Sequence, residues 1–176
     1  LVARLWPLLT RRGARVVTVS SGAHRITGIR WDDVQCERDY DPWQAYGQSK
    51  TANVLLAIEV DRRGASQGVR GFSLDPGAIL TPLQRHLTRE WMVEQGWMDA
   101  EGNGINPDFK TTEQGAATAT WAATSPQLEG KGGVFLADCD IVSPEGVASW
   151  ATDADEAARL WDLSVELTGV DIDARL

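Results

Sequence analysis

Residues 15–21 read RVVTVSS, and this stretch decides the fold. A short run of β-branched residues with little polar alternation predicts a strand buried in a parallel sheet. The run follows Gly13 and a segment over 1–12 that has the character of a helix end, because basic residues and glycine favour a helix C-terminus. After a loop over 22–42, good helix formers with spaced apolar positions predict a long helix over 43–64.

The rest of the chain continues this alternation of helices and strands. The order predicts the α/β class, with a parallel sheet, right-handed crossovers and a single domain over residues 1–176. The remaining predicted elements are strands over 69–74 and 132–137, a short helix over 83–95, and helices over 112–124 and 153–167.

The composition excludes several classes of protein. A hydrophobic fraction of 43% and a charged fraction of 24% are ordinary for a soluble globular chain. The 25 acidic and 17 basic residues give a net charge of −8, which disfavours nucleic-acid binding. No apolar run approaches the length of about 20 residues that a membrane span needs. Cys36 and Cys139 match neither a metal-ligand nor a disulfide spacing, so we expect a cytoplasmic protein without a metal site.

Residues 46–50 read YGQSK and open the long helix. Residues four apart share one helical face, so the ammonium of Lys50 should lie near the phenol of Tyr46. A nearby cation lowers the pKa of a phenol, and a general acid/base works best when its pKa is near the operating pH. Ordinary surface helices also carry such pairs, so the spacing alone decides little.

Polar and flexible residues also follow two successive strands of the predicted sheet. Ser20 and Ser21 end the first strand, and residues 76–81, which read PGAILT, end the second. Ligands of open α/β sheets bind outside the carboxyl ends of the strands, where a serine can orient a carbonyl and glycine admits a close backbone approach. Each of these two segments alone could be an ordinary turn, but together they predict one ligand-binding site at this edge of the sheet.

The combination Val-Ser-Ser, then Tyr-x-x-x-Lys opening a long helix, then Pro-Gly-x-x-x-Thr resembles the short-chain dehydrogenase/reductase family. Residues 112–130 and 160–164 resemble its retinol-dehydrogenase-like branch, near the WW-domain oxidoreductases. The 25-residue spacing from Ser21 to Tyr46 also fits that branch. The resemblance implies the C-terminal half of a Rossmann-like, doubly wound parallel sheet with flanking helices.

The resemblance also implies a role for each matching residue. Tyr46 would be the general acid/base, Lys50 would lower its pKa and bind the nicotinamide ribose, and Ser21 would hold the substrate oxygen. Residues 82–110 would form a substrate lid. NAD or NADP would be the cofactor, a small carbonyl or alcohol would be the substrate, and a homodimer would fit the family. The implied cofactor contacts are Tyr46, Lys50, Pro76, Gly77, Ile79 and Thr81.

The chain also departs from the family pattern. The glycine-rich phosphate loop and the Asn-Asn-Ala-Gly segment are absent, and the glycines at 102 and 104 follow no strand and open no helix. Thr18 stands where relatives have asparagine. Because the chain opens at Leu1, within a predicted helix, we expect it to be part of a longer protein. Alone it should be inactive, since it lacks the helix N-terminus that holds the pyrophosphate, and its strand over 15–21 would present an unpaired edge.

Two functional hypotheses therefore stand. The parent protein is a hydride-transferring oxidoreductase, or the chain is a non-catalytic remnant or interaction half-domain; coding DNA upstream of Leu1 would discriminate them. His24 could contact substrate or could be a loop histidine with solvent or backbone partners, and His86 in the lid offers less support for a role. Trp91 and Trp97 could line an apolar pocket or pack the lid on the core, and packing is favoured. The choice between NAD and NADP depends on residues that this chain does not contain.

Overall fold

The computed structural model describes residues 1–172 and confirms the predicted alternation of helices and strands. Three of the predicted boundaries agree closely with the structure, because each has a clear local signal at its start. A proline follows the N-cap Asp41 in the long helix, and Thr111 and Asp153 cap two later helices. The elements are α1 (Val2–Leu9), β1 (Ala14–Val19), α2 (Pro42–Gly64), β2 (Val69–Asp75), α3 (Arg89–Glu94), α4 (Thr112–Thr124), β3 (Val134–Ala137), β4 (Asp140–Ile141) and α5 (Ala154–Thr168).

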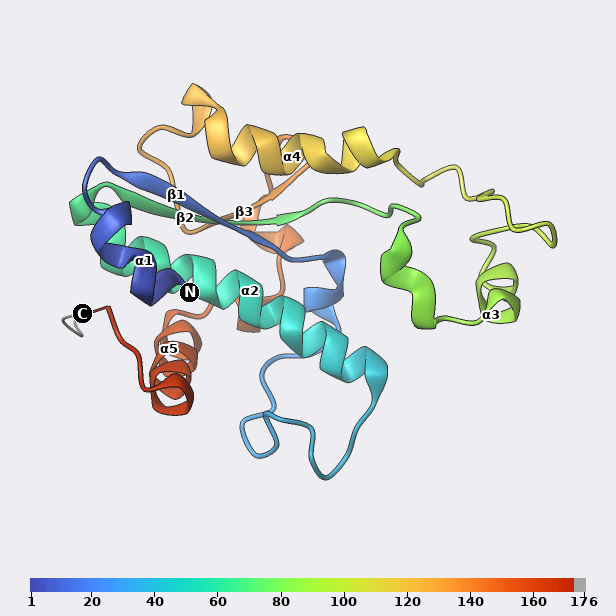
Figure 1. The fold of residues 1–176 in the computed structure, drawn as a ribbon, viewed down its shortest axis with the longest axis horizontal. Helices are drawn as coiled ribbons and strands as arrows, with labels where there is room; N and C mark the ends of the chain where they lie inside the picture. The colour runs from blue at the N-terminus through green and yellow to red at the C-terminus, as the bar shows by residue number, and fades with distance from the viewer. Residues whose placement is uncertain (173–176) are drawn as a thin grey trace.

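The sheet has four strands in the order β1-β2-β3-β4. The first three are parallel, with Ala14 opposite Val69 and Phe72 opposite Val134, and β4 is antiparallel to β3. Figure 1 shows α4 on one face of the sheet, and α1, α2 and α5 on the other. Helices on both faces of a mainly parallel sheet confirm the predicted α/β, doubly wound class.

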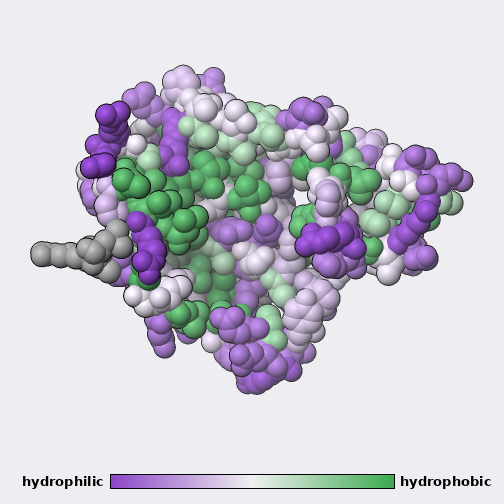
Figure 2. All heavy atoms as spheres, in the orientation of Figure 1, coloured by the Kyte–Doolittle hydropathy of each residue, from purple (hydrophilic) through white to green (hydrophobic). Residues whose placement is uncertain are grey.

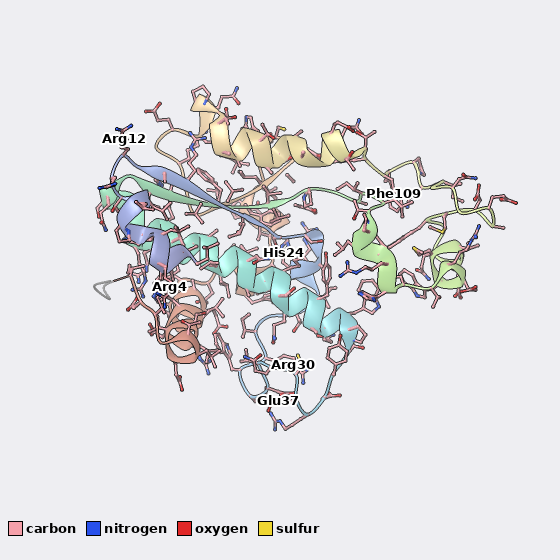
Figure 3. All side chains as sticks on the ribbon, in the orientation of Figure 1. Arg4, Arg12, His24, Arg30, Glu37 and Phe109 are labelled. Carbon is pink, nitrogen blue, oxygen red and sulfur yellow. The ribbon has the colours of Figure 1, made fainter. Side chains whose placement is uncertain are left out.

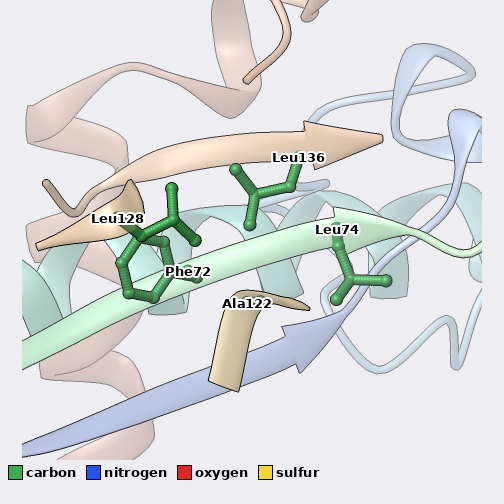
Figure 4. Packing of buried hydrophobic residues seen from close by; sticks show 5 residues of the cluster. All are labelled: Phe72, Leu74, Ala122, Leu128 and Leu136. Carbon is green, nitrogen blue, oxygen red and sulfur yellow. The ribbon is translucent and has the colours of Figure 1, made fainter. Parts of the chain in front are cut away.

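Among the described residues, three clusters of buried side chains hold these layers together, and two of them lie on opposite faces of the sheet. Figure 4 shows the first, in which Phe72, Leu74 and Leu136 project from β2 and β3 beside Ala122 of α4 and Leu128. The second lies on the opposite side of the sheet and joins four elements through Trp6, Val60, Val69 and Trp161. Burying a large apolar side chain contributes roughly 1.5–3 kcal/mol, so both faces of the sheet stabilise the fold.

The long helix α2 lies unusually close to the sheet. A Cβ atom added at Gly71 in β2 would come within 2.0 Å of the Ala57 carbonyl oxygen of α2. The amide of Gly71 also donates to Asp61 Oδ1 at 3.1 Å, and Arg70 Nε donates to the same oxygen at 2.7 Å. Glycine at position 71 therefore sets the distance between β2 and the helix that carries Tyr46.

The single short helix predicted over 83–95 is wrong. The structure has a 3₁₀ helix at Pro82–His86 and then α3, separated by Leu87 in an extended conformation. Thr88 caps α3, because its Oγ1 accepts from the amide of Trp91 at 3.2 Å. A second N-cap inside the predicted helix divides it, since a capping residue has non-helical dihedral angles.

The short strand β4 was not predicted. It follows a tight turn in which Asp138 and Cys139 have left-handed φ angles of 50° and 59°. The turn at Asp138 and Cys139 returns the chain into the sheet, where Asp140 begins β4. Neither turn residue is glycine, the usual signal for such a turn, so no hairpin could be predicted from the residues at these positions.

None of the helices within residues 1–172 combines the length and the apolar composition that crossing a bilayer requires. The longest, α2, has 23 residues, and it carries charged side chains such as Glu59, Asp61 and Arg62. Its buried positions face the sheet and α5 instead.

Candidate active site

The carboxyl ends of β1 and β2 meet beside the start of α2. Asp75, the last residue of β2, joins the two strand ends, since its Oδ2 accepts from the amide of Gly22 at 2.9 Å and its Oδ1 accepts from the amide of Gly77 at 2.9 Å. Asp75 was not among the predicted site residues. Its signal was an acidic residue directly before a Pro-Gly turn at the end of a buried strand.

A cavity of about 820 Å³ opens at this edge of the sheet. Figure 2 shows a hollow between the body of the molecule and the projecting segment 82–110, with hydrophobic residues on part of its rim. This volume lies within the range of small-molecule sites. The lining includes every site residue that the sequence predicted: Ser21, Tyr46, Lys50, Pro76, Gly77, Ile79 and Thr81.

Tyr46 and Lys50 lie side by side in the cavity wall. Lys50 Nζ is 5.4 Å from the centre of the Tyr46 ring and donates to the Val19 carbonyl at 3.2 Å. Asn53 Nδ2 donates to the same carbonyl at 3.0 Å. Burial lowers the pKa of Lys50 from its usual value, and the carboxylate of Asp75 opposes that shift. The ammonium is therefore fixed against the end of β1, beside the tyrosine.

The two serines at the end of β1 have different roles in the structure. Ser20 is buried and its Oγ donates to the Lys50 carbonyl at 2.7 Å, which holds α2 against β1. Ser21 is half-buried, and its Oγ accepts from the amide of Ala23 at 3.2 Å. A hydroxyl that accepts one hydrogen bond can still donate its own hydrogen, so Ser21 can serve a ligand in the cavity.

Thr81 and Ile79 have structural partners as well as a place in the lining. Thr81 caps the following 3₁₀ helix, since its Oγ1 accepts from Leu83 at 3.2 Å and donates to Gln84 Oε1 at 3.3 Å. Gln84 Nε2 donates to the Ile79 carbonyl at 2.9 Å. This local network shapes the segment that leaves β2 and covers one side of the cavity.

His24 lies outside the cavity lining, in the interior behind Ser21 (Figure 3). Its Nε2 accepts from the amide of Ala148 at 3.3 Å, so the hydrogen resides on Nδ1, which donates to the Ser21 carbonyl at 2.7 Å. The ring packs 4.8 Å from Phe135. Of the two sequence interpretations, the one with backbone partners agrees with this placement. His86, by contrast, is exposed and contributes to the lining.

We expect the neutral form of His24 to make stability depend on pH. Burial lowers the pKa of His24 below its usual 6.5; the Ser21 carbonyl opposes this shift, Arg25 adds to it and Asp75 opposes it. The unfolded chain therefore takes up a proton at higher pH than the folded one. The contribution of neutral His24 to the free energy of unfolding is complete above pH 6.5 and falls as the pH drops through 6.5. Urea unfolding from pH 7.5 to about 5 measures it.

His86 provides the matched control for this experiment, because it is the only other histidine of the chain. Between pH 7.5 and about 5, the free energy of unfolding should decrease less in His24→Gln than in the parent protein. In His86→Gln this decrease should equal that of the parent protein. Equal acid losses in the parent and in His24→Gln would show that His24 makes no such contribution.

No family model matches the chain, but individual relatives do. A short-chain dehydrogenase/reductase of Penicillium roqueforti is 40% identical over 162 residues, covering 88% of this chain and 46% of that protein. Retinol dehydrogenase 12 of Mus musculus is 36% identical over 160 residues, covering 89% of this chain and 46% of that protein. This chain belongs to the short-chain dehydrogenase/reductase family. The predicted resemblance, including that to retinol dehydrogenases, is confirmed.

A solved structure supports the fold assignment of this short-chain dehydrogenase/reductase chain. The crystal structure of an uncharacterized protein from Mycobacterium Paratuberculosis superposes with a TM-score of 0.64 and 28% identity, covering 98% of this chain and 58% of that one. The chain spans about half the length of the curated relatives that it matches.

Proposed function

We propose that the protein carrying this chain transfers a hydride between a nicotinamide cofactor, NAD or NADP, and a carbonyl or alcohol. The observation that supports this most directly is the shared cavity of Tyr46, Lys50 and Ser21 at the carboxyl edge of the sheet. A phenol, a cation and a hydroxyl are the groups that moving a proton at a substrate oxygen requires. The names of the relatives, dehydrogenases and reductases, agree with this chemistry.

The lining residues offer the polar groups and the open backbone that a nicotinamide ribose and carboxamide would contact. Lys50 offers an ammonium, Thr81 a hydroxyl, and Gly77 has a φ of +83° in the turn after β2, where glycine permits close backbone approach. No aspartate or glutamate is among the lining residues. We therefore assign the cofactor contacts to Tyr46, Lys50, Pro76, Gly77, Ile79 and Thr81. When bound, the cofactor would supply or accept the hydride.

The phosphates of the cofactor must find their partners elsewhere. The segment Gly102-Asn103-Gly104 lies in a turn closed by a bridge between Met98 and Gly104. It precedes no helix, so it cannot present helix amides to a pyrophosphate. The prediction that this glycine pair is not a phosphate loop agrees with that position.

In carbonyl reduction, we assign three steps to this chain's own residues. Ser21 donates a hydrogen bond to the substrate oxygen and orients it. Tyr46 gives its hydroxyl proton to the oxygen as negative charge develops there. The Lys50 ammonium, held at the Val19 carbonyl, stabilises the phenolate that remains. Alcohol oxidation runs through the same groups in reverse, with Tyr46 accepting the proton.

Cofactor oxidation tests the proposal directly. The complete gene product should consume NADH or NADPH in the presence of a carbonyl panel, and should reduce NAD or NADP with the matching alcohols. A folded protein that binds neither cofactor and turns over no member of the panel would contradict the proposal. That result would favour the second hypothesis, a non-catalytic interaction half-domain.

Replacing Ser21 by alanine should lower kcat/KM by about 100-fold, because one donor to the substrate oxygen is lost. Ser49→Ala is the matched control: Ser49 is exposed on α2, lies outside the lining, and its Oγ donates only to the Tyr46 carbonyl. Steady-state kinetics of both variants measure the difference. Equal rates in the two variants would remove Ser21 from the mechanism.

A further inference from the structure

Five aromatic rings form a continuous row along one wall of the cavity, which we call the aromatic row: Tyr46, Trp43, Trp91, Trp97 and Phe109. The Trp43 ring meets Tyr46 edge-on at 6.5 Å and Trp91 at 5.6 Å, measured between ring centres. Trp91 to Trp97 is 5.1 Å, and Trp97 to Phe109 is 5.8 Å. All five rings belong to the lining. The row therefore starts at the proposed proton donor and continues into the segment 82–110.

The aromatic row differs from the tryptophans of the core. Trp6 and Trp161 are only 5% and 6% exposed, as expected for rings that serve packing. Trp43 is 44% exposed, and none of the other four rings of the row is buried. These rings contact one another but keep surface open to the cavity. Exposed apolar surface gathered around one concave site indicates a ligand.

The charges around the cavity narrow the class of ligand. Lys50 and His86 are the only titratable side chains of the lining other than Tyr46, although the chain contains 25 acidic residues. A cationic substrate would find no carboxylate partner there, and burying an unpaired charge is costly. Lys50 donates to Val19, lies beside Tyr46 and is the proposed cofactor contact, so it leaves no cation for an anionic substrate. An uncharged substrate therefore fits this lining best.

We propose that the substrate is an uncharged aldehyde, ketone or alcohol whose reacting carbon is carried by a flat ring system, and that Trp43 selects it. This inference rests on the proposed function, because Tyr46 fixes where the reacting oxygen lies. Trp43 precedes Tyr46 by one helical turn and lies beside it, so a ring attached near the reacting carbon would contact the Trp43 ring. Aromatic pairs gain stability beyond the area they bury, so the ring's flatness is itself recognised.

The test compares two aldehydes of similar size, 2-naphthylacetaldehyde and its fully saturated decalin analogue. The methylene between ring and carbonyl keeps their intrinsic reactivities alike. The complete gene product should show a kcat/KM about tenfold higher for the flat aldehyde. Trp43→Leu should bring that ratio close to one, and Trp43→Phe, which restores a flat ring, should recover most of it.

Tyr40→Leu is the control for this series, because Tyr40 is 69% exposed, lies just before α2 and is absent from the lining. It should keep the ratio of the parent protein. Turnover of both aldehydes with equal kcat/KM would overturn the inference while leaving the proposed function intact. An unchanged ratio in Trp43→Leu would overturn the role of Trp43.

Absence of turnover with either aldehyde would count against the proposed function instead. Calorimetric titration with the two corresponding alcohols then tests the selection of flat rings through binding, independently of turnover. Tighter binding of the flat alcohol, lost in Trp43→Leu, would support the selection of flat rings. Equal affinity for the two alcohols would overturn it.

Discussion

Replacing Tyr46 by phenylalanine should lower kcat of the complete gene product by about 1,000-fold, because a positioned general acid/base contributes roughly 10²–10⁴ to the rate. Phenylalanine keeps the ring that Trp43 meets edge-on and that Lys50 Nζ approaches to 5.4 Å. Only the hydroxyl is removed. The substrate and cofactor should therefore still bind, while the developing alkoxide loses its proton source.

The measurement is kcat at saturating substrate, together with the dissociation constant of the nicotinamide cofactor. Tyr40→Phe is the matched control, since the chain has only two tyrosines and Tyr40 is exposed outside the lining. It should retain the parent rate. If Tyr46→Phe turned over at the parent rate with normal affinity for the cofactor, the proton would have to come from another group.

The position of the cavity could be predicted from the sequence because it follows from topology. A β-branched run and a helix with Tyr-x-x-x-Lys at its start predict a parallel strand and its crossover, and parallel strands present their carboxyl ends at one edge. Ser21, Gly77 and Lys50 then had to lie near one another. The structure places all the predicted residues in one lining for this reason.

Contacts between segments far apart in sequence could not be predicted in the same way. Asp75 binds the amide of Gly22, 53 positions away, and His24 accepts from Ala148, 124 positions away. No local pattern encodes these pairs, because they depend on how the segment after β1 meets the end of β2 and the segment after β4. The distinction between the buried Ser20 and the accessible Ser21 has the same origin, since it depends on which side chain faces α2.

The segment 82–110 was the least predictable part of the chain. Thr88 caps α3 inside the single helix predicted over 83–95 and so divides it, and Thr81 caps the 3₁₀ helix that comes before. The sequence favoured packing of Trp91 and Trp97 on the core. In the structure the two rings pack on each other and on neighbouring rings, and they also line the cavity, so neither alternative alone describes them.

The close contact of α2 with β2 leads to the largest expected effect on stability. Gly71→Ala should lower the free energy of unfolding by about 3 kcal/mol, near the upper end for added volume in a well-packed core. The new Cβ would lie 2.0 Å from the Ala57 carbonyl oxygen and 3.0 Å from the Asp61 amide nitrogen. Both are backbone atoms of α2, which cannot rotate away as a side chain would, so the whole helix must shift.

Gly104→Ala is the matched control, because a Cβ there comes no closer than 3.5 Å to its nearest neighbour, Leu80, and the position is exposed. Its effect should stay within about 0.5 kcal/mol. Urea unfolding of the two variants measures the difference in stability, and equal stabilities would show that α2 can shift at little cost.

Because α2 carries Tyr46 and Lys50 while β2 leads to Gly77, Gly71→Ala should displace α2 and so lower the activity under conditions where the protein remains folded. Stability and catalysis therefore depend on the same helix-to-strand distance, which only a residue without a side chain at position 71 allows.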